Sequence, residues 1–135
     1  MTAIATRPLS DSTDSLLRFA LRLDATLTGF LGLGIAVMAD PMARLTGLTA
    51  VQEYVIGAMF VLYGLGVYAL AAMPDLRRVG IALVVFNTVG TAGFVAVATA
   101  GVLPLTGAGV AVALACSMYT AVFAVLQYLG VRRLA

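Results

Sequence analysis

Histidine and lysine are both absent from the 135-residue sequence, and Cys116 is its single cysteine. Histidine is the commonest metal ligand and the usual proton shuttle near neutral pH, so its absence disfavours zinc and haem chemistry. One cysteine can form neither an intrachain disulfide nor a metal site by itself. We therefore expect no metal and no cofactor.

Charge is also scarce. Charged residues make up 10% of the chain and hydrophobic residues 62%, and the formal net charge is +2. A soluble domain has about 25% charged and about 45–50% apolar residues. So few charges cannot cover a water-facing surface, and so much apolar content excludes a disordered chain. The sequence predicts an integral membrane protein in a lipid bilayer, and its scattered basic residues give no reason to expect a nucleic-acid partner.

Long runs without charge locate the membrane-spanning helices. The runs cover residues 25–39, 54–74 and 79–131, and the last is long enough for two spans, broken near Gly101. A spanning helix needs about 20 residues, so the sequence predicts an all-α bundle of four transmembrane helices. We place the helices at residues 13–39, 50–73, 76–100 and 105–130, within one domain (13–135) that follows a short polar segment (1–12).

Capping residues mark the same boundaries. The expected N-caps are Asp11 or Ser12 for the first helix, Asp75 for the third and Thr106 for the fourth. Thr49 and Gln52 have the spacing of a capping box at the start of the second helix. A short interfacial helix is predicted at about residues 41–47, with Asp40 as its N-cap and Pro41 at its first position.

Basic residues predict the orientation of the chain. All the arginines except Arg44 lie on one side of the predicted topology, namely Arg7, Arg18, Arg22, Arg77, Arg78, Arg132 and Arg133. Cytoplasmic loops carry the excess of arginine and lysine in membrane proteins. We therefore expect a multi-pass protein of the inner (plasma) membrane with both termini in the cytoplasm.

Small residues recur on one face of three predicted helices. The ridges are Ala25, Gly29, Gly32 and Ala36; Ala92, Ala96 and Ala100; and Gly109, Ala113, Ser117 and Ala121. Close packing of small residues promotes helix association in lipid. The ridges predict a tight four-helix bundle, and they leave open a homodimer or a membrane-protein partner that packs on one of these faces.

Polar residues form a second set of helix faces. Polar groups in hydrocarbon must find partners inside the protein, so we expect these faces to point inward. Judged by depth, four side chains converge in the cytoplasmic half of the bundle and form the predicted ligand-binding set: Asp24, Tyr68, Asn87 and Gln127. Tyr63 and Tyr119 lie nearer the middle, where they either pack in the core or line a cavity.

Two carboxylates are candidate catalytic groups, and each also has a structural interpretation. Asp24 either binds a cation or a proton in a pocket, or forms an ion pair with a nearby arginine at the membrane edge. The candidate partners are Arg18, Arg22 and Arg78. Glu53 is either functional or only a favourable negative charge in the first turn of the second helix.

Several stretches resemble small bacterial four-helix membrane proteins of the DoxX-like kind, in particular uncharacterised actinobacterial ones. They are Leu21-Arg22-Leu23-Asp24-Ala25, the segment 40–48, Tyr63-Gly64 and the segment 126–133. The resemblance spans most of the chain. It implies a four-helix fold in a bacterial membrane, and it implies neither an activity nor a catalytic residue.

Three functions stay open on the sequence alone, because no catalytic motif is present. The first is a non-enzymatic bundle that binds a lipophilic small molecule or packs against a membrane partner. The second is a proton-coupled exporter of small molecules that uses Asp24. The third is a small membrane-embedded enzyme that acts on a lipophilic substrate, with Asp24 or Glu53 as acid or base.

Overall fold

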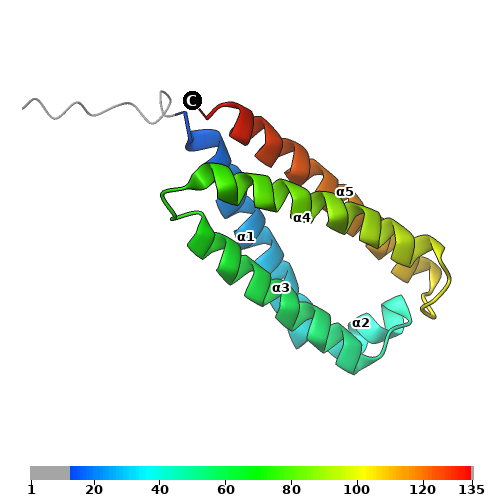
Figure 1. Cartoon of the computed structure of the whole chain (residues 1–135). Helices are drawn as coiled ribbons and strands as arrows, with labels where there is room; N and C mark the ends of the chain where they lie inside the picture. Colours follow the sequence, from blue (N-terminus) through cyan, green and yellow to red (C-terminus); the bar gives the residue numbers. More distant parts are fainter. Residues whose placement is uncertain (1–12, 135) are drawn as a thin grey trace, which may run out of the picture.

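A computed structural model describes residues 13–134, and within them the regular structure is helical (Figure 1). The helices are α1 (Ser15–Val37), α2 (Ala39–Thr46), α3 (Ala50–Leu70), α4 (Leu76–Thr99) and α5 (Gly107–Arg132). All but α2 are long and apolar enough to cross a membrane. The prediction of an all-α membrane bundle with four spanning helices is confirmed. The polar segment 1–12, with the caps expected at Asp11 and Ser12, lies outside the described residues.

The predicted caps of the other three long helices are confirmed. Thr49 and Gln52 form the capping box of α3, since the Gln52 backbone N–H donates to Thr49 Oγ1 at 3.1 Å and the Thr49 N–H donates to Gln52 Oε1 at 2.9 Å. The N-cap side chains of α4 and α5, Asp75 and Thr106, each accept a backbone N–H three residues ahead. Side-chain capping of this kind satisfies backbone donors that have no partner within the helix.

The N-cap predicted for α2 is wrong. The helix begins at Ala39 with Met38 as its N-cap residue, so Asp40 lies inside the first turn. Met38 is also the C-cap of α1, and the chain changes direction at this residue. Pro41 is tolerated here because the first backbone nitrogens of a helix need no hydrogen-bond partner within it.

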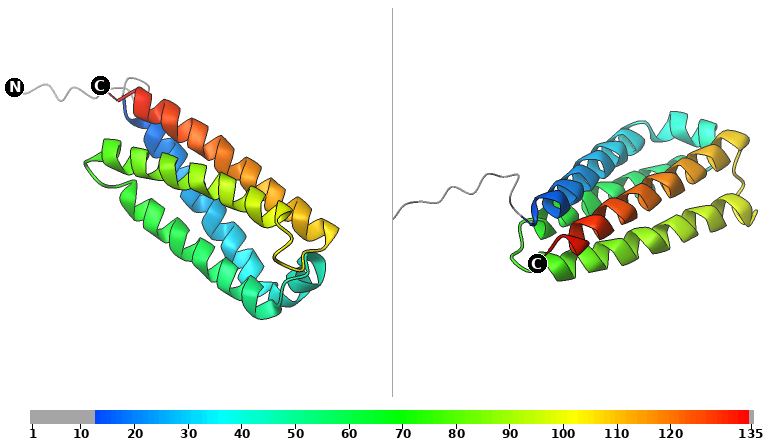
Figure 2. Two further views of the ribbon diagram at one scale, coloured as in Figure 1. Left: turned by 45° about the vertical axis from the view of Figure 1, so that its right-hand side comes forward. Right: turned by 90° about the horizontal axis from the view of Figure 1, so that it is seen from above.

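The bundle consists of two closely packed helix pairs, α1 with α3 and α4 with α5. The pairs lie close together at the end that holds the α3–α4 loop, the start of α1 and the end of α5 (Figures 1 and 2). They diverge towards the other end, where α2 lies (Figure 2). The fold is therefore narrow at one end and wide at the other.

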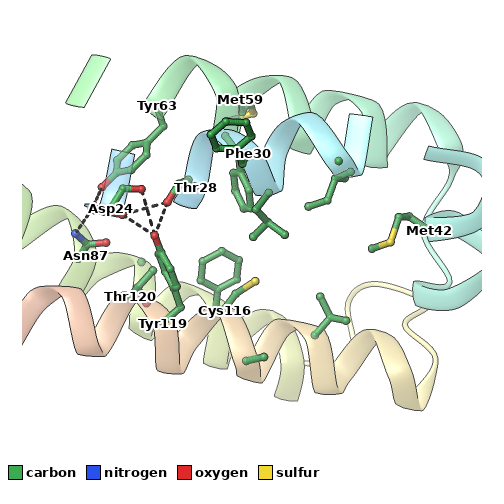
Figure 3. A pocket seen from close by; sticks show the side chains of 18 of the residues that line it. Asp24, Thr28, Phe30, Met42, Met59, Tyr63, Asn87, Cys116, Tyr119 and Thr120 are labelled. Carbon is green, nitrogen blue, oxygen red and sulfur yellow. Dashed lines mark hydrogen bonds between the residues drawn. The ribbon is translucent and has the colours of Figure 1, made fainter. Parts of the chain in front are cut away.

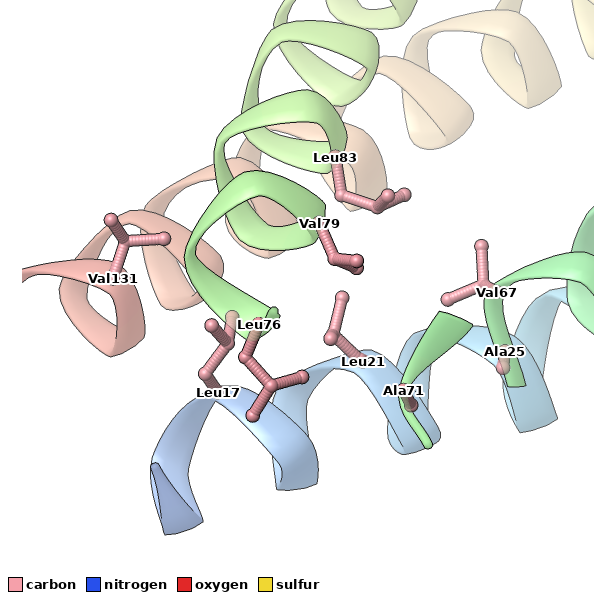
Figure 4. Packing of buried hydrophobic residues seen from close by; sticks show 9 residues of the cluster. All are labelled: Leu17, Leu21, Ala25, Val67, Ala71, Leu76, Val79, Leu83 and Val131. Carbon is pink, nitrogen blue, oxygen red and sulfur yellow. The ribbon is translucent and has the colours of Figure 1, made fainter. Parts of the chain in front are cut away.

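An aliphatic cluster closes the narrow end (Figure 4). Its buried members come from all four long helices: Leu17, Leu21, Ala25, Val67, Ala71, Leu76, Val79, Leu83 and Val131. Glycines allow the helices to approach there, because a Cβ built on Gly130 would lie 2.8 Å from Leu17 Cα. Real Cβ atoms essentially never come so close to another heavy atom.

Hydrogen bonds from Thr106 to α2 close the wide end. The Thr106 backbone N–H donates to the Thr46 carbonyl at 2.9 Å, and the Thr106 hydroxyl donates to the Leu45 carbonyl. Gly109 at the start of α5 lies directly against the Thr46 backbone. The short helix thus joins the α1–α3 pair to α5 at the end where the two pairs are farthest apart.

The small-residue ridges have different environments. The α1 ridge packs against glycines of α3, since a Cβ on Gly57 would lie 2.5 Å from the Gly32 carbonyl oxygen and one on Gly64 would lie 2.6 Å from that of Ala25. The α5 ridge is also turned inward. Ala92 and Ala96 of α4 and its C-cap residue Ala100 are exposed, so among residues 13–134 that ridge does not pack against another helix.

We expect Gly64→Ala to destabilise the protein by about 1–3 kcal/mol, because the added methyl forces α1 and α3 apart. Gly66→Ala is the matched control on the same helix, since a Cβ there meets no atom within 4 Å. Thermal unfolding in a mild detergent, followed by circular dichroism, measures both. Equal unfolding midpoints for the two variants would contradict the close α1–α3 contact.

Candidate functional site

A cavity of about 760 Å³ lies between the two helix pairs (Figure 3). Its walls are mostly apolar, with Phe30 and Ile35 from α1, Met59 and Phe60 from α3, Phe86 and Phe94 from α4, and Val112 from α5. Small-molecule sites typically have volumes of about 300–1,000 Å³ and predominantly apolar walls. The cavity therefore has the size and the lining of a site for a lipophilic molecule.

The cavity is open to the surroundings of the bundle on its side. Phe30, Met59 and Phe86 line it, and their exposed fractions are 71%, 61% and 59%. These residues lie on three helices that are long and apolar enough to cross a membrane. The aliphatic cluster closes the narrow end, so that end offers no route into the cavity.

One end of the cavity is polar, and Asp24 is its centre (Figure 3). Asp24 has no exposed surface and lies roughly 14 Å along α1 from the start of that helix. Its carboxylate accepts hydrogen bonds from the Tyr63 hydroxyl at 2.9 Å, Gln127 Nε2 at 2.9 Å, Asn87 Nδ2 at 3.4 Å, the Thr28 hydroxyl at 3.1 Å and the Tyr119 hydroxyl at 3.1 Å. The donors come from all four long helices. We call these six residues the Asp24 cluster.

The Asp24 cluster contains no cation. Within residues 13–134, Arg18 pairs with Asp14 at 2.9 Å and Arg78 pairs with Asp75 at 3.3 Å. Arg22 is exposed. The alternative in which one of these arginines forms an ion pair with Asp24 is therefore wrong. The carboxylate points to the interior of the bundle, whereas the arginine side chains lie at its surface.

The structure brings three of the four predicted ligand-binding residues together. Asp24, Asn87 and Gln127 are in direct contact, and Asn87 Nδ2 also donates to Gln127 Oε1 at 2.9 Å. Tyr68 is not part of the group, because its side chain is 59% exposed. Placing Tyr68 in the cluster was therefore wrong.

Tyr63 takes the place that the sequence assigned to Tyr68. The two tyrosines are five positions apart on α3, which turns them about 140° from each other around the helix axis. Depth alone suggested Tyr68, whereas the helix face decides the contact. Tyr119 also belongs to the cluster and is missing from the predicted ligand-binding set. Tyr63 and Tyr119 both line the cavity, which is one of the two roles that their central position allows.

Glu53 lies apart from the cavity. It is 3% exposed, sits in the first turn of α3 and accepts a hydrogen bond from the Thr46 hydroxyl of α2. The Thr46 hydroxyl is also close to the Met42 carbonyl, at 3.0 Å. The buried carboxylate of Glu53 thus attaches α2 to α3. Its negative charge is also favourable at the N-terminus of a helix.

A second polar group, made of Thr91, Ser117 and Thr120, lies between α4 and α5. The hydroxyls of Thr91 and Thr120 are 2.8 Å apart, and the Ser117 hydroxyl donates to the Thr91 carbonyl at 3.1 Å. Thr120 lines the cavity and lies within hydrogen-bond distance of the Ser117 carbonyl, at 2.9 Å. The Thr91–Thr120 and Ser117–Thr91 bonds join α4 to α5.

Compared with family models, with curated proteins and with solved structures, the chain matches none. The resemblance to DoxX-like proteins therefore stays an expectation that depends on the sequence stretches quoted above. Function has to be inferred from the cavity and the Asp24 cluster.

We expect Tyr63→Phe and Tyr119→Phe each to destabilise the protein by about 0.6–1.7 kcal/mol, because each removes a hydrogen bond inside the bundle. Tyr68→Phe is the matched control, since that side chain is outside the cluster. The unfolding midpoint in detergent measures all three. If Tyr68→Phe costs as much as the other two substitutions, the assignment of the cluster is wrong.

Proposed function

We propose that the chain is a non-enzymatic binding protein of a bacterial inner membrane that takes up a lipophilic small molecule from the bilayer. The observation that carries this proposal is the cavity of about 760 Å³, which has apolar walls, a side opening and a single buried polar end. A lipophilic molecule in the cavity would place its apolar body between the helix pairs. Its head group would meet the Asp24 cluster.

The proposal includes the orientation of the chain. The positive-inside rule favours cytoplasmic termini, which puts the narrow end of the bundle on the cytoplasmic side. The Asp24 cluster then lies in the cytoplasmic half of the membrane, directly beyond the aliphatic cluster. A bound molecule would be held between the two ends of the bundle rather than at the membrane surface.

The exporter and the enzyme have weaker support. Export through the bundle would require the aliphatic cluster to open, because that cluster closes the narrow end of the bundle. Catalysis by Asp24 would require its oxygens to exchange partners, since five side chains already donate to them. Glu53 is not among the residues that line the cavity. Binding requires neither change.

A substitution that fills the cavity tests the proposal. Gly34 lines the cavity, and a Cβ built there meets no atom within 4 Å, so the side chain of Gly34→Phe has room beside the helix to occupy the cavity. Gly93→Phe is the matched control, because a Cβ at Gly93 also meets nothing and this glycine does not line the cavity. Both positions lie inside long helices.

Native mass spectrometry after gentle extraction from the membrane is the measurement. We expect a discrete small-molecule adduct on the wild-type protein and on Gly93→Phe, and a loss of most of that adduct on Gly34→Phe. A wild-type spectrum without an adduct, or equal adducts on both variants, would contradict the proposed function.

A further inference from the structure

The cluster members that line the cavity direct their hydrogen atoms to acceptors inside the protein. Tyr63 has one hydroxyl hydrogen, and it donates to Asp24 at 2.9 Å. The Asn87 amide directs its hydrogens to Gln127 Oε1 at 2.9 Å and to Asp24 at 3.4 Å. A molecule in the cavity finds no free donor on either residue.

The same holds for Thr28 and Tyr119. Their hydroxyl oxygens are 2.8 Å apart, and each is 3.1 Å from Asp24 Oδ1. Both hydroxyls donate to Asp24 Oδ1, and the Tyr119 hydroxyl also has the Asp24 backbone carbonyl within reach at 3.2 Å. All of these acceptors belong to the cluster. Thr120, farther along the wall, has the Ser117 carbonyl and the Thr91 hydroxyl as internal acceptors.

The polar end of the cavity therefore presents acceptors. A hydroxyl group has one donor hydrogen and two acceptor lone pairs, so a hydroxyl that has given its hydrogen away can still accept. Tyr63 and Tyr119 both line the cavity, and each has donated its hydroxyl hydrogen and can still accept one. A carbonyl or carboxylate head group would face oxygens with no hydrogen to offer, and its desolvation would remain uncompensated.

The charge of the cluster also favours a head group that donates hydrogen bonds. Amide nitrogens can only donate, and five donors around one side chain suit an ionised carboxylate, which only accepts. Hydrogen bonds from neutral groups stabilise that charge but do not cancel it. No arginine of residues 13–134 pairs with Asp24, so this part of the chain leaves a negative charge without a counter-ion in surroundings of low polarity.

We infer that the molecule taken up is a lipophilic amine in its protonated form. Its N–H groups would donate to the hydroxyl oxygens of Tyr63 and Tyr119, and its positive charge would lie next to the buried carboxylate of Asp24. Its hydrocarbon part would fill the apolar cavity. This inference rests on the proposed function, since it assigns the head group of the molecule that the cavity holds.

A matched series of amphiphiles tests the inference with the wild-type protein. Dodecylamine, dodecanol and dodecanoate share one chain and differ in the head group, and each is titrated into the full-length protein in detergent at neutral pH. Native mass spectrometry gives the fraction bound, with Gly34→Phe as the reference for non-specific adducts. We expect dodecylamine to bind at least about tenfold more tightly than dodecanol, which corresponds to about 1.4 kcal/mol. We expect dodecanoate to bind the wild-type protein no better than it binds Gly34→Phe.

The outcomes separate the inference from the proposed function. If dodecanol or dodecanoate binds as tightly as dodecylamine, and all bind better to the wild type than to Gly34→Phe, the cavity binds lipophiles and the amine assignment is wrong. If none of the three binds better to the wild type than to Gly34→Phe, the proposed function itself fails.

Two substitutions locate the preference in the Asp24 cluster. Asp24→Asn removes the charge, and we expect dodecylamine to lose at least about tenfold in affinity while dodecanol changes less. If Asp24→Asn does not fold, the double variant Tyr63→Phe, Tyr119→Phe removes the two acceptors, and we expect the preference for the amine over the alcohol to fall by a similar factor. An unchanged preference in a folded variant of either kind overturns the inference.

Discussion

A carboxylate buried inside a membrane-spanning bundle is the constraint on which the rest of this structure depends. Its charge is costly in hydrocarbon surroundings unless polar groups of the protein surround it. Here five side chains from all four long helices supply those groups, and within residues 13–134 none of them is a cation. The Asp24 cluster thus joins the two helix pairs. Its directional hydrogen bonds specify how the pairs are rotated relative to each other more sharply than apolar contacts alone would.

The cavity follows from unequal packing within the bundle. Glycines bring α1 and α3 into backbone contact, and a similar close pairing holds α4 to α5. The pairs meet at the aliphatic cluster and are joined again through α2, so the space between them is bounded at both ends. Large side chains such as Phe30 and Phe86 line this space without filling it, which leaves room for a molecule from the bilayer.

The sequence predicts the spans and most of the caps because these depend on local features. Charge-free runs locate the apolar part of each helix, and Thr49, Asp75 and Thr106 cap the helices in which they are expected. The site depends on helix rotation, which local patterns specify poorly. Depth correctly grouped Asp24 with Asn87 and Gln127, but it placed Tyr68 where the face of α3 puts Tyr63. The alternative of an arginine partner for Asp24 is wrong for the same reason, since closeness in sequence or in depth does not give the direction of a side chain.

An experimental structure of the wild-type protein in a lipid nanodisc, at a resolution that resolves side chains, tests the central claim most directly. Our account predicts elongated non-protein density between α3 and α4, with one end within hydrogen-bond distance of the Tyr63 and Tyr119 hydroxyls and with Asp24 still enclosed by its five donors. A bundle in which the two helix pairs close completely on each other would contradict it. An arginine paired with Asp24 in that structure would contradict it equally.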